Sequence, residues 1–179
     1  MKYLILCEGP NELEIINILL ENDFLIFNED DLLGLQPYHA RQIDKSAIVQ
    51  NELNIYTGND LIIIRIGDKQ NDTLRIPKKY KEKFLGEQKK YCTKPELEIL
   101  LIISEGLWSQ FEKVKSKIKP KDFAKQKIKL NGKNYDNSSK FYKDYYRKSP
   151  QKLTEALIIY KSKNGSHQKD ELYLADLLK

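Results

Sequence analysis

Two acidic residues stand where apolar stretches of the chain end, and this placement suggests metal chemistry. Glu8 follows the run Tyr3–Cys7, and Asp68 follows the run Asp60–Ile66. Short apolar runs closed by turn residues are typical of buried strands in a parallel sheet, and sites gather beyond the carboxyl ends of such strands. If the two strands are neighbours, a divalent cation would relieve the repulsion between the carboxylates. Their oxygens favour Mg²⁺ or Mn²⁺, and such an ion can activate water at a phosphodiester.

The elements that must position these acids alternate between strand and helix. Residues 2–22 are expected to form a strand, a tight turn at Gly9 and a helix with Asn11 as its N-cap. Pro95 suits the first turn of a second helix, which runs through Ser104 toward Lys117. The alternation predicts an α/β domain whose mostly parallel sheet is flanked by helices. Further short strands are expected at 24–27 and 91–93, helices at 44–53, 77–90, 153–160 and 170–178, and a loop at 28–42.

The opening of the chain resembles the first motif of TOPRIM domains. That motif is an apolar strand, Glu-Gly, two variable residues, an acid and a helix, and here it reads Glu8-Gly9-Pro10-Asn11-Glu12. The spacing is closest to small RloB-like and OLD-type TOPRIM proteins. The resemblance covers roughly residues 1–110 and implies a Rossmann-like TOPRIM fold.

Two later segments are similar to the other TOPRIM motifs. The family's second strand ends in Asp-x-Asp, whereas this chain has Asp68 followed by Gln70, with Asp72 as a substitute two positions on. The segment Lys94–Glu98 is similar to the Asn-Pro-x-Phe-Glu segment of RloB-like proteins, and by that match Glu98 is the functional acid.

The resemblance implies a Mg²⁺- or Mn²⁺-dependent nuclease acting on DNA or RNA, of a type associated with bacterial defence against phage and mobile elements. Glu8 and Asp68 would be catalytic, and both would bind metal together with Asp72. Glu12 and Glu98 would support the site. A protein partner such as an ATPase would be compatible with the family. Because Gln70 departs from the motif, the alternative is a catalytically degenerate subunit that binds nucleic acid or protein.

Each acid also has a purely structural explanation. Strands often end in Asp or Glu for solubility and turn formation. Glu12 would interact favourably with the helix dipole as a first-turn acid. Glu98 would be an ordinary surface residue of its helix if it faces solvent.

Charge is unevenly distributed along the 179 residues. Residues 1–66 contain 4 basic and 11 acidic residues, whereas residues 67–179 contain 27 basic and 15 acidic ones. We expect a TOPRIM-like core at 1–110 and a helical, basic C-terminal extension at 111–179. Basic side chains contact phosphates, and the nucleic-acid-binding candidates are Lys140, Lys143, Arg147, Lys148 and Lys161. The interleaved aromatic rings would either stack on bases or pack onto the sheet, and the lysines would equally suit a solvated face.

Several other classes of protein are disfavoured. No apolar run approaches the roughly 20 residues that span a bilayer, so no membrane association is expected. Cys7 and Cys92, without a secretion signal, indicate a reducing cytoplasm rather than a disulfide framework. No Gly-rich phosphate loop is present, which weakens a flavodoxin-like small-molecule binder.

Overall fold

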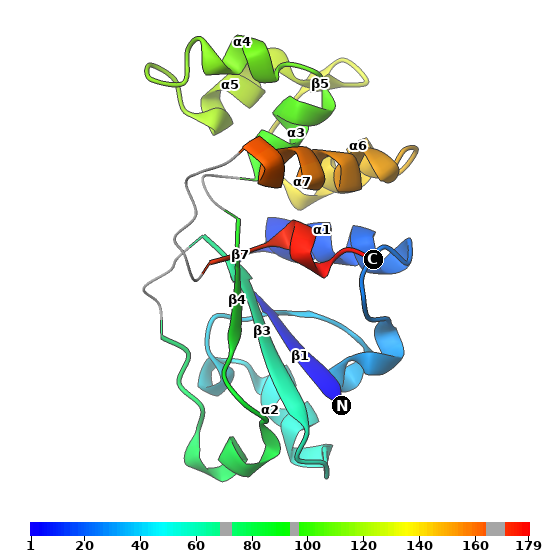
Figure 1. The fold of residues 1–179 in the computed structure, drawn as a ribbon, viewed down its shortest axis with the longest axis vertical. Coiled ribbons are helices and arrows are strands. Elements are labelled where there is room, and N and C mark those ends of the chain that lie inside the picture. The colour runs from blue at the N-terminus through cyan, green and yellow to red at the C-terminus, as the bar shows by residue number, and fades with distance from the viewer. Residues whose placement is uncertain (69–72, 94–96, 164–170) are drawn as a thin grey trace.

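A five-stranded parallel sheet forms the centre of the molecule (Figure 1). The computed structural model describes residues 1–68, 73–93, 97–163 and 171–179. The strand order is β2-β1-β3-β4-β7, and every neighbouring pair runs parallel, which confirms the expected α/β class. The strands are β1 (Lys2–Cys7), β2 (Tyr38–His39), β3 (Leu61–Gly67), β4 (Lys89–Cys92) and β7 (Leu172–Tyr173).

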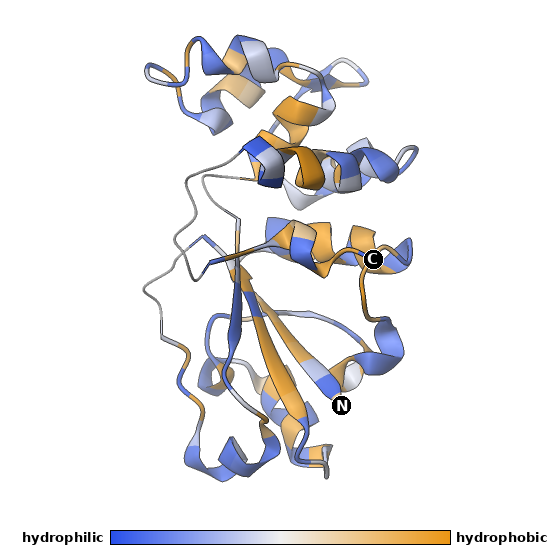
Figure 2. Cartoon of the chain, in the orientation of Figure 1, coloured by the Kyte–Doolittle hydropathy of each residue, from blue (hydrophilic) through white to orange (hydrophobic). Residues whose placement is uncertain are grey.

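The two strands predicted to carry the acids are direct neighbours. In their register Cys7 lies beside Ile66, so both strands end at the same edge of the sheet. Apart from Lys2 and Arg65, both strands are mainly apolar on both faces because each face is covered (Figure 2). Ile5 and Ile64 belong to one hydrophobic core, whereas Leu6 and Ile63 belong to another.

The two cores are closed by different helices. Six helices contribute to the core on one face, and one helix covers the other. The first group is α1 (Pro10–Glu21), α3 (Glu98–Ser104), α4 (Trp108–Glu112), α5 (Pro120–Lys127), α6 (Ser139–Tyr146) and α7 (Gln151–Lys163); the second is α2 (Ala47–Ile55). The smaller elements are η1 (Glu29–Asp31), η2 (Leu33–Leu35), η3 (Ile43–Lys45), η4 (Lys78–Lys83), η5 (Leu174–Leu177) and the hairpin β5 (Lys129–Leu130) with β6 (Lys133–Asn134).

Two predicted helices differ in their ends. Gly9, not Asn11, is the N-cap of α1, because Pro10 suits the first helical position, where no backbone N–H is needed. The helix expected to continue toward Lys117 stops at Ser104, and Gly106 follows with φ 68°. This left-handed conformation suits glycine and ends the helix.

Short elements account for the remaining differences. The predicted strand at 24–27 is reduced to one bridge between Leu25 and Leu178, and the predicted helix at 170–178 is β7 followed by η5. The helix expected at 77–90 is η4 followed by β4, and β2 lies inside the expected loop 28–42. Elements of two to four residues are too short to show a period, so pairing with the sheet decides them.

The C-terminal part of the chain returns to the sheet through β7 at its edge (Figure 1). The expected division at residue 110 stays a prediction. No helix within the described ranges is both long and apolar enough to cross a membrane.

Candidate functional site

Three of the predicted acids line one pocket at the carboxyl end of the sheet. This acidic pocket has a volume of about 250 Å³. Glu12 comes from α1, Asp68 follows β3, and Glu98 opens α3. Its full lining is Asn11, Glu12, Asp68, Thr93, Leu97, Glu98, Lys121 and Asn137. Elements far apart in sequence therefore bring these acids together, whereas Glu8, which the two-strand argument paired with Asp68, does not line this pocket.

Glu12 interacts electrostatically with the three other acids, Asp68, Glu8 and Glu98. Burial raises its pKa, and the negative charges of Asp68, Glu8 and Glu98 raise it further, against a backbone hydrogen bond that lowers it. The carboxylate folds back over Gly9, where a Cβ atom would lie 2.5 Å from Glu12 Oε2. Glu12 thus does more than favour the helix dipole, because a solvated first-turn acid would not have its pKa raised by burial.

Glu98 faces inward and is held by hydrogen bonds. It is 5% exposed, so the solvent-facing explanation is wrong. The Tyr135 hydroxyl, on a side chain 2% exposed, donates to Glu98 Oε1 at 2.8 Å and lies 3.0 Å from the Tyr142 hydroxyl. Burial and the nearby Glu98 charge raise the pKa of Tyr135, which keeps its hydroxyl a donor.

Asn137 links this network to a cation. In the amide orientation that satisfies its neighbours, it donates to Glu98 Oε1 at 3.0 Å and accepts from Lys121 Nζ at 3.0 Å. Asn11 donates to the Asn137 carbonyl at 3.4 Å. The segment between β6 and α6 therefore ties the helical part of the chain to the carboxyl end of the sheet.

Two polar atoms of the pocket lack a hydrogen-bond partner among the described residues. They are the hydroxyl of Thr93, which is 5% exposed, and Oδ1 of Asn11. Buried polar groups are rarely left unsatisfied, so these oxygens suit a hydrated ligand in the pocket. Together with the carboxylates they are oxygen groups of the kind that Mg²⁺ binds. Within the described ranges no three Asp, Glu, His or Cys side chains already converge as a metal-binding group.

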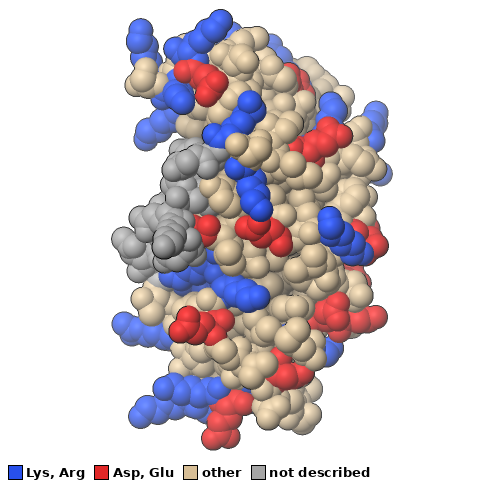
Figure 3. All heavy atoms as spheres, viewed as in Figure 1, with Lys and Arg blue, Asp and Glu red and all other residues tan. Residues whose placement is uncertain are grey.

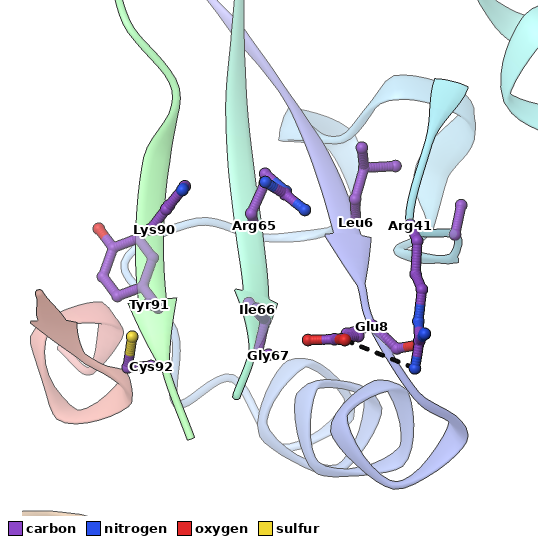
Figure 4. Close-up of a pocket in the computed structure, with 10 residues that line it drawn as sticks. Leu6, Glu8, Arg41, Arg65, Ile66, Gly67, Lys90, Tyr91 and Cys92 are labelled. Carbon is purple, nitrogen blue, oxygen red and sulfur yellow. Dashed lines mark hydrogen bonds and ion pairs between the residues drawn. The ribbon is translucent and has the colours of Figure 1, made fainter. Parts of the chain in front are cut away.

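Glu8 lies in a second, smaller depression beside the first. This cationic hollow of about 20 Å³ is lined by Glu8 and by three basic side chains, Arg41, Arg65 and Lys90 (Figure 4). Arg41 pairs with Glu8 at 3.4 Å. A Cβ atom on Gly67 would lie 2.4 Å from Glu8 Oε2, so any other residue there would have to displace Glu8. The remaining lining residues are Leu6, Ala40, Ile66, Gly67, Tyr91 and Cys92.

The predicted nucleic-acid-binding residues lie outside both pockets. Lys140 pairs with Asp144 and Lys161 with Asp176, and all five candidates are exposed. Of the aromatic side chains between them, Phe141, Tyr142 and Tyr146 are buried in the core, as the packing interpretation expected. On the face drawn in Figure 3, basic and acidic side chains are interspersed from one end of the molecule to the other.

Sequence reasoning overlooked the basic and polar members of the two sites. Arg65 carried a usable signal, because it is the charged residue inside the apolar strand β3. Lys121 is one lysine in a long basic tract of the sequence, and only the fold shows that it lines the acidic pocket. Gln70, Asp72 and residues 94–96 lie outside the described residues, so the expected role of Asp72 stays a prediction.

Comparison of the chain with protein-family models, with curated proteins and with solved structures found no match.

Proposed function

We propose that the protein is a Mg²⁺-dependent nuclease of TOPRIM type that cleaves phosphodiester bonds of nucleic acid. The observation that carries this proposal is the meeting of Asp68, Glu12 and Glu98 in one pocket beyond a parallel sheet. The Thr93 hydroxyl, which has no hydrogen-bond partner within the described part of the chain, supports it independently. A divalent ion bound there would activate water and stabilise charge on the phosphate.

Each pocket residue has a role that follows from its surroundings. Asp68 is exposed at the end of β3 and would hold the ion directly. Glu98 would orient the site because Tyr135 and Asn137 fix its carboxylate. Glu12 has a raised pKa, so it would hold a proton more readily than an ordinary glutamate and serve as the general acid or base. Lys121 would stabilise negative charge at the phosphate.

Metal binding tests the site separately from activity. Calorimetric titration with Mn²⁺ should show binding to the wild type, and crystals soaked in Mn²⁺ should show anomalous density in the acidic pocket. Asp68→Asn should abolish both. Mn²⁺ binding by Asp68→Asn with unchanged affinity would contradict the proposed site.

Cleavage tests the reaction itself. Asp68→Asn and Glu12→Gln should lower Mg²⁺-dependent cleavage of DNA or RNA by more than about 100-fold, since even partners behind the metal ligands usually contribute 10- to 100-fold. Asp44→Asn, an exposed acid at η3 that does not line the pocket, is the matched control and should retain activity. Full cleavage by both pocket variants would refute the proposal.

One observation favours a second candidate, a non-catalytic subunit that binds nucleic acid or protein. Arg41 pairs with Glu8, the acid to which the TOPRIM resemblance assigns catalysis. This candidate predicts nucleic-acid binding that survives EDTA, with no cleavage in Mg²⁺ or Mn²⁺.

A further inference from the structure

The cationic hollow places charged side chains where a parallel sheet is normally apolar. Leu6, Arg65 and Lys90 lie in one row across β1, β3 and β4 (Figure 4). Leu6 belongs to the core beneath α2, but Arg65 and Lys90 in the same row are half-buried cations. Two adjacent strands therefore bring positive charges to the carboxyl end of the sheet on this face.

Basic side chains outnumber acidic ones among the residues that line the hollow, which favours an anion. Arg41, Arg65 and Lys90 line it together with one carboxylate, Glu8. Arg41 is an exposed side chain that already orients its guanidinium at the mouth through Glu8. Guanidinium groups match the oxygens of phosphate in geometry, and lysine adds a compact positive charge.

The size of the hollow decides between a small molecule and a polymer. Its volume of about 20 Å³ holds one water-sized group, whereas small-molecule sites commonly enclose about 300–1,000 Å³. One phosphate oxygen could enter, while the rest of the ligand would remain outside. This suits a backbone phosphate of a strand that passes over the edge of the sheet.

The hollow and the acidic pocket adjoin each other along two strands. Gly67 lines the hollow and Asp68 the acidic pocket; Cys92 lines the hollow and Thr93 the acidic pocket. The two depressions are therefore neighbours at the carboxyl end of the sheet. We infer that Arg41, Arg65 and Lys90 form a phosphate anchor that holds the nucleic-acid backbone next to the bond to be cleaved.

This inference rests on the proposed function for its substrate, but it can be tested without cleavage. Binding of a fluorescent oligonucleotide is measured by anisotropy in EDTA over a series of salt concentrations. Arg65→Gln/Lys90→Gln should weaken binding about tenfold or more and reduce the slope of log affinity against log salt by about one to two, as expected for two lost phosphate contacts. An unchanged slope would overturn the anchor.

The control removes the same charge from the opposite end of the sheet. Lys78 and Lys81 are exposed on η4, which leads into the bridge between Phe84 and Leu61 at the start of β3. Lys78→Gln/Lys81→Gln should leave the slope unchanged, and an equal loss in this control would show that only net charge matters. Thermal unfolding checks that the variants fold. If Arg65→Gln/Lys90→Gln does not fold, Arg41→Gln, at an exposed position, should still reduce the slope by about one.

A small phosphate compound is the competing occupant. Millimolar inorganic phosphate would then raise the melting temperature of the wild type but not of the double variant, and the oligonucleotide slopes would coincide. That combination overturns the inferred anchor. Loss of Mn²⁺ binding or cleavage would count only against the proposed function, because anchoring is measured without metal.

Discussion

Tyr135→Phe removes a single buried hydroxyl from the network that holds Glu98. That hydroxyl donates to a buried carboxylate at 2.8 Å and lies 3.0 Å from the Tyr142 hydroxyl. A hydrogen bond to a charged group is worth about 1.5–3 kcal/mol, and a neutral one about 1 kcal/mol. We therefore expect the variant to lose about 3 kcal/mol of unfolding free energy. For a domain of this size, this lowers the melting temperature by roughly 6–12 °C.

Tyr145→Phe is the matched control, because Tyr145 also donates to a glutamate, Glu105, but in an exposed pair. This variant should lose at most about 1 kcal/mol. Urea unfolding of both variants, with equal m-values, measures the two losses. Equal losses, or a loss below about 1 kcal/mol for Tyr135→Phe, would refute the reasoning that burial gives this hydrogen bond its value. A double-mutant cycle that combines Tyr135→Phe with Glu98→Gln would then measure the interaction energy between these two side chains.

Two further predictions concern the glutamates at the sheet edge. The pKa of Glu12 is raised above 4.5 in the folded chain. The contribution of protonated Glu12 to the free energy of unfolding is therefore fully present below pH 4.5, and it is lost as the pH rises through the folded pKa. In EDTA, Glu12→Gln should be more stable than the wild type at about pH 7.5 and equally stable near pH 4; parallel stability curves would exclude this linkage. Gly67→Ala should lose about 1–3 kcal/mol through crowding, because its methyl group would meet both Oε2 and Cβ of Glu8. Denaturant unfolding measures this, and a loss below about 0.5 kcal/mol would mean that Glu8 moves aside freely.

The longer elements of the fold were predictable because their own residues carry the pattern. The continuous apolar runs that form β1 and β3 need cover on both faces. Gly9 and Pro10 are turn and helix-start residues, and they mark where α1 begins. Ser46 caps α2 by accepting from the Val49 amide. These signals are local, and neighbouring residues reinforce them.

The sequence by itself determined that acids follow two buried strands and that these strands belong to a parallel sheet. Only the tertiary structure decided which acids meet, because the register of β1 with β3 and the inward face of Glu98 depend on contacts between distant segments. The same holds for Lys121 and Arg41, which look like ordinary surface residues until α5 and the segment after β2 place them at the edge of the sheet. Local propensity is encoded over a few residues, whereas a site assembled from six segments depends on how the whole chain packs.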